Sequence, residues 1–316
     1  MTTDVTAEQK KKPYRILSLD GGGAKGFYTL GVLKEIEGLI GDRPLCERFD
    51  LVFGTSTGAI IAALIALGYK VDDIYALYKE YVPTIMKRWT KRGKSAALAN
   101  LAQQVFADKK FEDVKTAIGI VATRWMEERP MIFKASVAQA HGRQGTFAPG
   151  FGVLIGDAVQ ASCSAYPFFR RKIVTTSADH IIELADGGFC ANNPTLYAIA
   201  DALIPLDKKP EDIRVVSVGV GVYPKPKSMN ILKCIINMLP SVQLLQKTLE
   251  INTQSMDQLR HILYKHIPTV RISEKFERPE MATDFMEYNL TKLNILLQRG
   301  AQSYAEKEEQ LKEFLL

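Results

Sequence analysis

Residues 49–67 read FDLVFGTSTGAIIAALIAL, and this stretch decides the fold. Phe49 to Phe53 is typical of a short buried strand, and the apolar run from Ala59 to Leu67 is typical of a buried helix. The turn between them matches G-x-S-x-G, with Ser56 at its centre. Such a sharp strand-to-helix turn, a nucleophile elbow, projects the serine Oγ out of the sheet, and the helix N-terminus favours negative charge there. The position of the motif makes Ser56 a candidate nucleophile.

The same order of strand, glycine turn and helix occurs at the start of the chain. Tyr14 to Leu19 predicts a short buried strand, and Tyr28 to about Leu39 predicts a helix. A further strand, Arg214 to Val218, again ends in glycines. Strands that alternate with helices indicate an α/β fold with a mostly parallel central sheet flanked by helices. We expect residues 71–126 to be helical and polar, and residues 230–316 to be helical.

The first glycine turn, residues 20–26, reads DGGGAKG and allows two interpretations. Gly21, Gly23 and Gly26 satisfy the dinucleotide-binding pattern G-x-G-x-x-G between a strand and a helix. That pattern also requires an acidic residue at the end of the second strand, whereas Asp42 lies in a Gly-Asp-Arg-Pro turn. The turn lacks the lysine that would have to follow its last glycine in a Walker A loop.

The second interpretation of this turn is anion binding. Backbone amides at a helix N-terminus point at the ligand, and the helix dipole favours negative charge. An oxyanion hole needs this geometry, and glycines permit the close approach. Lys25 would either add positive charge near the anion or lie in solvent, and the sequence leaves both options open.

A serine nucleophile also needs a base. The Ser-Asp-His order of α/β hydrolases would place a histidine late in the chain. His261 and His266 are available, but both lie in an expected helix, residues 258–266, and we expect them to be surface or packing residues. Asp186 is the better candidate, because it follows an expected strand, residues 180–184, and enters a glycine turn that can point its carboxylate into a cleft.

Three motifs in this order resemble those of the patatin-like phospholipase family. They are D-G-G-G-x-K-G at 20–26, G-T-S-T-G at 54–58 and D-G-G-x-x-x-N-N-P at 186–194. Residues 161–169, ASCSAYPFF, are similar to the family's A-S-x-A-x-P-x-x-F segment, with one extra residue between the serine and the alanine. The resemblance covers Tyr14 to Tyr223. It implies a modified α/β-hydrolase fold and a Ser-Asp dyad without histidine.

The resemblance assigns roles to individual residues. Ser56 is implied to be the nucleophile and Asp186 the base, while the amides of Gly22, Gly23 and Ala24 form the oxyanion hole. The supporting motif positions are Gly21, Lys25, Gly26, Gly54, Gly58, Gly187 and Gly188. Lysine stands where the family often has arginine, so the charge is kept but the planar fork of a guanidinium is lost.

The implied reaction is phospholipase A-type cleavage of acyl esters in membrane glycerophospholipids. Ser56 attacks the ester carbonyl to form an acyl-enzyme, which water activated by Asp186 then hydrolyses. A carboxylate with the ordinary pKa of about 3.9 is a weak base at neutral pH. Partial desolvation in a lipid-filled cleft would raise that pKa. We expect no cofactor and no metal, since no cluster of metal ligands stands out in the sequence.

Composition sets the size and class of the protein. The chain has 316 residues, of which 47% are hydrophobic and 24% charged, as in an ordinary globular protein. We expect a single catalytic domain over residues 13–316, with core motifs in 14–223 and a helical C-terminal part in 230–316. Residues 1–12 are expected to form a disordered tail.

Cysteine spacing and hydropathy bear on location. The 4 cysteines stand far apart without a C-x-x-C pair, and the polar residues 1–12 do not resemble a secretory signal. The longest apolar run, Ala59 to Leu67, is much shorter than the roughly 20 residues that span a bilayer. We expect a cytoplasmic protein that associates peripherally with the inner face of the membrane.

The formal net charge of +6 favours anionic surfaces such as lipid headgroups, or serves solubility alone. Residues 87–94, KRWTKRGK, and residues 170–172, RRK, are the candidate contacts with an anionic bilayer. The alternative for the first cluster is an ordinary solvated face. We expect no nucleic acid polymer as a partner.

Residues 134–152, KASVAQAHGRQGTFAPGFG, resemble a stretch of the bacterial patatin-like effectors that cyclic dinucleotides activate in anti-phage defence. This resemblance implies a lipase that is held off until a cyclic dinucleotide activator binds. An alternative of another class is a catalytically idle lipid- or nucleotide-binding module on the same scaffold. The sequence also leaves an oligomer open.

Overall fold

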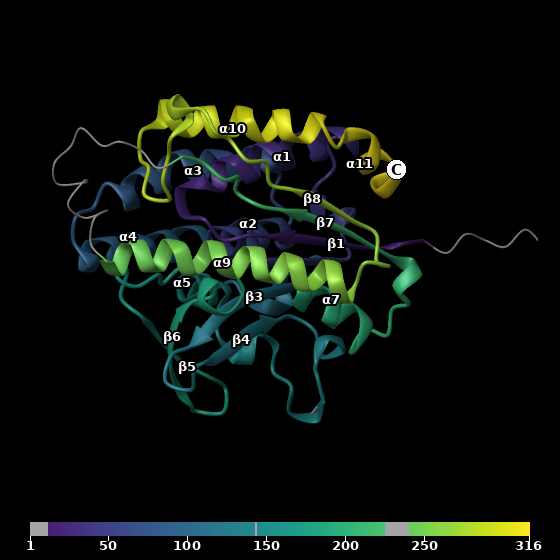
Figure 1. Cartoon of the computed structure of the whole chain (residues 1–316). Coiled ribbons are helices and arrows are strands. Elements are labelled where there is room, and N and C mark those ends of the chain that lie inside the picture. The colour runs from purple at the N-terminus through teal and green to yellow at the C-terminus, as the bar shows by residue number, and fades with distance from the viewer. Residues whose placement is uncertain (1–11, 143, 225–239) are drawn as a thin grey trace, which may run out of the picture.

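A computed structural model describes residues 12–142, 144–224 and 240–316, and Figure 1 shows a central sheet with helices on both of its faces. The sheet has eight strands in the order β5-β6-β3-β2-β1-β7-β8, with β4 paired to β3. The parallel strands are β1 (Tyr14–Leu19), β2 (Leu51–Thr55), β3 (Ala117–Arg124), β7 (Ile213–Val218) and β8 (Thr269–Ile272). The antiparallel additions are β4 (Arg129–Lys134), β5 (Lys172–Thr175) and β6 (Ile181–Asp186). The prediction of a mostly parallel sheet flanked by helices is confirmed.

Helices connect the strands and cover the sheet. They are α1 (Gly26–Leu39), α2 (Thr57–Ala66), α3 (Val71–Met86), α4 (Lys91–Leu101), α5 (Ile155–Ser162), α6 (Gly188–Ala191), α7 (Thr195–Leu203), α9 (Pro240–Leu263), α10 (Leu290–Ala305) and α11 (Glu308–Leu315). Alternate strand residues enter two cores. Leu17 and Val52 belong to the core that includes α1, α2 and α3, whereas Ile16 and Leu51 belong to the core that includes α7.

Two regions that we expected to be helical contain strands. Residues 71–126 form α3 and α4 but end in β3, and the C-terminal part contains β8 between α9 and α10. A short, fully buried apolar run such as Ile118–Ala122 in β3 cannot be told from a buried helix by periodicity. The alternation in β8 covers only four residues, which are too few to outweigh the helical pattern around them. The helix expected at 258–266 ends at Leu263.

Strand β8 belongs to the same sheet as the motif-bearing strands, so the C-terminal part contributes to the central sheet. The expected tail at 1–12 lies, apart from Lys12, outside the described residues, as does the beginning of the part expected at 230–316. In the described part of the chain, no helix is both long and apolar enough to cross a membrane.

Sheet register brings two of the motifs together. Thr55 at the end of β2 pairs with Val121 of β3, and the next β3 residue, Ala122, pairs with Asp186 at the end of β6. Residues 56 and 186 therefore leave the sheet at the same level on either side of β3. The antiparallel direction of β6 is what allows its last residue to reach this point.

Candidate active site

Ser56 occupies a strained turn between β2 and α2. Its φ and ψ are 53° and −121°, a backbone conformation that side chains other than glycine rarely adopt. Its N–H donates to Ser162 Oγ at 2.9 Å, and that hydroxyl donates to the Val121 carbonyl at 2.6 Å. Close packing of the turn also requires Gly58, because a Cβ there would lie 2.3 Å from the Leu19 carbonyl oxygen. The motif thus forms the elbow expected from sequence.

Asp186 lies beside this serine. Ser56 Oγ donates a hydrogen bond of 2.8 Å to Asp186 Oδ2, and the Gly188 N–H donates to Oδ1 at 2.7 Å. The side chain is buried, at 2% exposure. Burial raises the pKa of Asp186 to about 7, although both hydrogen bonds oppose the shift. A hydrogen bond to the serine hydroxyl and a pKa near neutrality are the two properties that a general base for Ser56 would need.

Residues 161–169 brace both members of this pair. Besides the bond from Ser162 to the Ser56 amide, the Ser164 carbonyl accepts the Asp186 N–H at 3.1 Å. The Ser162 carbonyl accepts the Gly187 N–H at 3.2 Å. The sequence marked this segment only as a similarity, without a role for either serine.

The glycine loop at 20–26 lies next to Ser56. A Cβ built on Gly21 would lie 3.2 Å from Ser56 Cβ. The amides of Gly22 and Gly23 make no hydrogen bond within the described part of the chain, so both are available to an anion. The Ala24 N–H, in contrast, donates to the Phe285 carbonyl at 2.9 Å. Of the three amides expected in the oxyanion hole, Ala24 is engaged elsewhere in this conformation.

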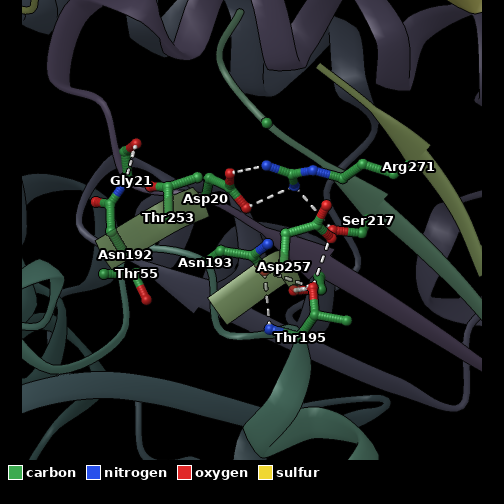
Figure 2. A network of polar contacts seen from close by, with 12 residues as sticks. Asp20, Gly21, Thr55, Asn192, Asn193, Thr195, Ser217, Thr253, Asp257 and Arg271 are labelled. Carbon is green, nitrogen blue, oxygen red and sulfur yellow. Dashed lines mark hydrogen bonds and ion pairs between the residues drawn. The ribbon is translucent and has the colours of Figure 1, made fainter. Parts of the chain in front are cut away.

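A buried polar network holds the start of the glycine loop, and Figure 2 shows the Asp20 carboxylate facing the Arg271 guanidinium. Arg271 of β8 binds Asp20 through two contacts, Nη1 to Oδ1 at 2.9 Å and Nη2 to Oδ2 at 2.5 Å. Its Nη1 also donates to Ser217 Oγ at 2.8 Å, and Ser217 contacts Thr195 Oγ1 at 2.9 Å. The network joins β8, β7, α7 and the loop after β1.

Helix α9 holds the loops on the other side. The Asn192 N–H donates to Asn252 Oδ1 at 2.7 Å, and Asn192 Nδ2 donates to Thr253 Oγ1 at 2.7 Å. Asn192 in turn exchanges hydrogen bonds with Gly21, accepting its N–H at 2.9 Å. The loop after Asp186 and the glycine loop are therefore fixed to each other and to α9. Sequence reasoning missed Arg271, Asn252 and Thr253, because they lie outside any motif.

Ser56 and Asp186 line a cavity of about 380 Å³. Its apolar side comes from α2, α3 and α4, and includes Ile60, Leu64, Leu77, Tyr78, Tyr81, Val82, Ile85, Met86, Leu98 and Leu101. Lys25 also lines it, and burial lowers the pKa of this lysine. No histidine of the described residues lines the cavity. His261 and His266 are exposed, as expected.

The described residues hold no group of three or more His, Cys, Asp or Glu side chains that could bind a metal ion. The glycine loop lines the same cavity as Ser56, which favours the oxyanion interpretation of its motif.

The two basic segments predicted from sequence lie together. Lys91 Nζ lies 4.3 Å from the ring centre of Tyr166, and the Arg170 N–H donates to Ser95 Oγ at 2.8 Å. Lys94 departs from the exposed cluster, because it is buried and donates to the Met86 carbonyl at 2.8 Å. Trp89 is 58% exposed.

Residues 134–152 are tied to the body of the protein by Asp201 of α7. Its carboxylate binds Lys134 Nζ at 2.5 Å and His141 Nε2 at 2.7 Å. None of the described residues of this stretch lines the Ser56 cavity.

Comparison with known proteins gives consistent matches. The family model described as patatin-like phospholipase matches residues 17–199. A cUMP-AMP-activated phospholipase of Escherichia coli is 68% identical over 302 residues, which cover 96% of this chain and 94% of the relative. A cGAMP-activated phospholipase of Vibrio cholerae is 27% identical over 67% of this chain and 65% of the relative. The crystal structure of VipD from Legionella pneumophila, 13% identical, matches with a TM-score of 0.50 over 96% of this chain and 67% of VipD.

Proposed function

The chain belongs to the patatin-like phospholipase family of lipid acyl hydrolases, and from this premise we propose that Ser56 and Asp186 are its catalytic dyad. The observation that carries the proposal is the 2.8 Å hydrogen bond from Ser56 Oγ to a buried carboxylate. Burial raises the pKa of Asp186 to about 7, which suits a general base at neutral pH.

The reaction proceeds in two halves. Asp186 takes the Ser56 proton while Oγ attacks the ester carbonyl carbon, and the amides of Gly22 and Gly23 bind the oxyanion. The tetrahedral intermediate collapses to an acyl-enzyme as Asp186 returns the proton to the leaving alkoxide. Water then attacks the acyl-enzyme carbonyl and gives a proton to Asp186. As the bond between the acyl carbon and Ser56 Oγ breaks, Asp186 passes that proton to Oγ, which restores Ser56 and releases the fatty acid.

The acyl chain lies in the apolar side of the cavity, between α2, α3 and α4. Aliphatic side chains such as Ile60, Leu64 and Leu98 offer it a surface without hydrogen-bond donors. The enzyme meets the bilayer through the basic segments 87–92 and 170–172. Support comes from Trp89, which is exposed, and from the contacts that bring the two basic segments together. Burial, followed by the charges of Arg171 and Arg170, lowers the pKa of Lys91.

Activity is held off until a cyclic dinucleotide binds, as part of bacterial anti-phage defence. This proposal rests on the relative whose name describes activation by cUMP-AMP, at 68% identity over nearly the whole chain. It also fits the engaged Ala24 amide, because an incomplete oxyanion hole weakens catalysis.

Release of fatty acid from phospholipid vesicles, with and without cUMP-AMP, tests the function. We expect hydrolysis that cUMP-AMP increases, and a loss on the order of 10³-fold or more in Ser56→Ala and Asp186→Asn. Hydrolysis that survives Ser56→Ala would remove the dyad. A folded wild-type protein that binds lipid or nucleotide but cleaves nothing would instead favour the idle binding module.

A further inference from the structure

The cavity around Ser56 has a second wall that an acyl chain does not need. Helix α9 lines it with Gln243, Gln246, Lys247, Glu250 and Gln254. Counted from Gln243, the other four positions follow after 3, 4, 7 and 11 residues, so all five share one face of the helix. A fatty acyl chain makes no hydrogen bonds. A wall of amide and charged groups therefore fits a different, polar ligand.

A short turn that contacts the glycine loop lines the same cavity as α9. Thr283, Asp284 and Phe285 line the cavity. The Phe285 carbonyl accepts the Ala24 N–H at 2.9 Å, and the Phe285 ring packs edge-on against Phe168 with centroids 5.1 Å apart. Gly23 permits this approach, because its φ is +58° and a Cβ there would lie 2.5 Å from the Phe285 oxygen. The turn thus occupies a donor that the oxyanion would otherwise use.

The same turn holds a polar group without a partner. Thr283 is 7% exposed, and its Oγ1 is buried without a hydrogen bond to any described residue. The Tyr223 hydroxyl, which also lines the cavity, is likewise buried without a hydrogen bond to any described residue. Its ring stacks on Phe276 with centroids 4.9 Å apart and an interplanar angle of 17°. A buried hydroxyl without a partner costs free energy, so this conformation gains from a ligand that supplies one.

We propose that the α9 wall and the 283–285 turn form the binding site of a nucleotide phosphodiester, and that its binding withdraws the Phe285 carbonyl from the Ala24 N–H. The amide side chains of Gln243 and Gln246 carry both a donor and an acceptor, as the edges of bases do. Lys247 offers a cation for a phosphate. A lipid headgroup has no base edge for such amides, and this difference favours the nucleotide. The inference rests on the proposed activation by a cyclic dinucleotide, and it gives the place where that activator binds.

Gln246→Leu tests the location of the site, with Gln258→Leu as the matched control. Gln258 lies on the same helix, is exposed and does not line the cavity. The probe is cUMP-AMP, with its Kd measured by calorimetry and fatty acid release measured on vesicles. We expect Gln246→Leu to raise the Kd for cUMP-AMP about tenfold. The variant should reach the wild-type rate of fatty acid release only at higher cUMP-AMP concentrations. Its KM for phospholipid should stay at the wild-type value. Gln258→Leu is expected to match the wild type throughout.

Phe285→Ala tests the withdrawal of the turn. Loss of the contact with Phe168 loosens the turn, so we expect hydrolysis without cUMP-AMP to rise about tenfold towards the activated rate. Thermal unfolding shows whether the variant is folded. A folded Phe285→Ala protein with the low wild-type rate and an unchanged response to cUMP-AMP would overturn the withdrawal.

The remaining outcomes separate this inference from the proposed function. If cUMP-AMP stimulates the wild-type enzyme and the Gln246→Leu variant equally, the proposed site is wrong but the proposed activation stands. A Gln246→Leu protein with unchanged Kd but raised KM identifies a headgroup site instead. If the wild-type enzyme hydrolyses lipid but neither binds nor responds to cUMP-AMP, both the site and the proposed activation are wrong. The proposed dyad is not affected by that result.

Discussion

At the scale of single residues, the environment of Asp186 decides what the proposed dyad can do. The carboxylate accepts only the Ser56 hydroxyl and the Gly188 N–H among the described residues, and it is almost fully buried. Desolvation favours its neutral form more than these two bonds favour its charged form, so the pKa of Asp186 is raised to about 7. A carboxylate can then serve as base without a histidine between it and the serine.

This pKa predicts the pH dependence of hydrolysis. Asp186 accepts a proton only when ionised, and a raised pKa keeps it protonated at pH values where an ordinary aspartate is charged. We therefore expect kcat/KM for a soluble ester to fall about tenfold per pH unit below about pH 7. A rate profile that stays level down to about pH 5 would contradict the raised pKa. Circular dichroism over the same range is the control for unfolding.

The sequence points to Ser56 and Asp186 because each lies at a fixed place in a local turn motif, and the structure places the two side chains in hydrogen-bond contact. Ser162 and Ser164 could not, since their roles depend on which backbone groups the fold brings beside them. The Ala24 amide shows a further limit. A motif predicts that a donor is present, but only the tertiary structure shows that the Phe285 carbonyl already occupies it.

At the scale of elements, β8 and α9 hold in place the glycine loop and the loop after Asp186, and neither element belongs to a sequence motif. β8 supplies Arg271 to Asp20, and α9 supplies Asn252 and Thr253 to the loop that follows Asp186. The sequence of β8, Thr269–Ile272, alternates apolar Val270 and Ile272 with Arg271. This alternation is the one local signal of a strand there, and it spans too few residues to outweigh the helical pattern around it.

Removing Arg271 is predicted to destabilise the fold in a pH-dependent way. Burial raises the pKa of Asp20, and the Arg271 charge opposes that shift. In Arg271→Met the carboxylate stays buried without its partner, at a cost of about 3 kcal/mol in the free energy of unfolding. Protonation relieves this cost, so the loss should be larger at about pH 8 than at about pH 5.5. Urea unfolding at both pH values measures it.

Lys275→Met provides the comparison for Arg271→Met. Lys275 forms an exposed ion pair with Glu277 at 2.8 Å, and exposed pairs contribute little to stability. We expect its unfolding curve to overlay the wild-type curve at both pH values. Equal behaviour of the two variants would show that the Asp20–Arg271 pair does not stabilise the glycine loop.

At the scale of the whole molecule, the cavity and the basic surface share the same helices. α3 and α4 line the apolar side of the cavity, and the connection between them carries Arg88 and Trp89. Arg170 joins this surface through Ser95 of α4. Sequence predicted each basic segment separately, but their proximity depends on how the segment after α5 packs against α4. The proposed bilayer contact therefore lies on the same helices as the apolar side of the cavity.

Charge reversal on this surface is predicted to separate membrane binding from chemistry. Each Lys or Arg near an anionic bilayer contributes about 1 kcal/mol, so Lys91→Glu with Arg170→Glu should weaken binding to vesicles rich in anionic lipid by about tenfold or more. Cosedimentation measures this, and added salt should shrink the difference by screening. Because Ser56 and Asp186 are untouched, hydrolysis of a soluble short-chain ester should stay at the wild-type rate. Lys265→Glu, on an exposed residue after α9, is the control for net charge. If that control weakens vesicle binding as much as the double variant does, overall charge, rather than this surface, brings the enzyme to the membrane.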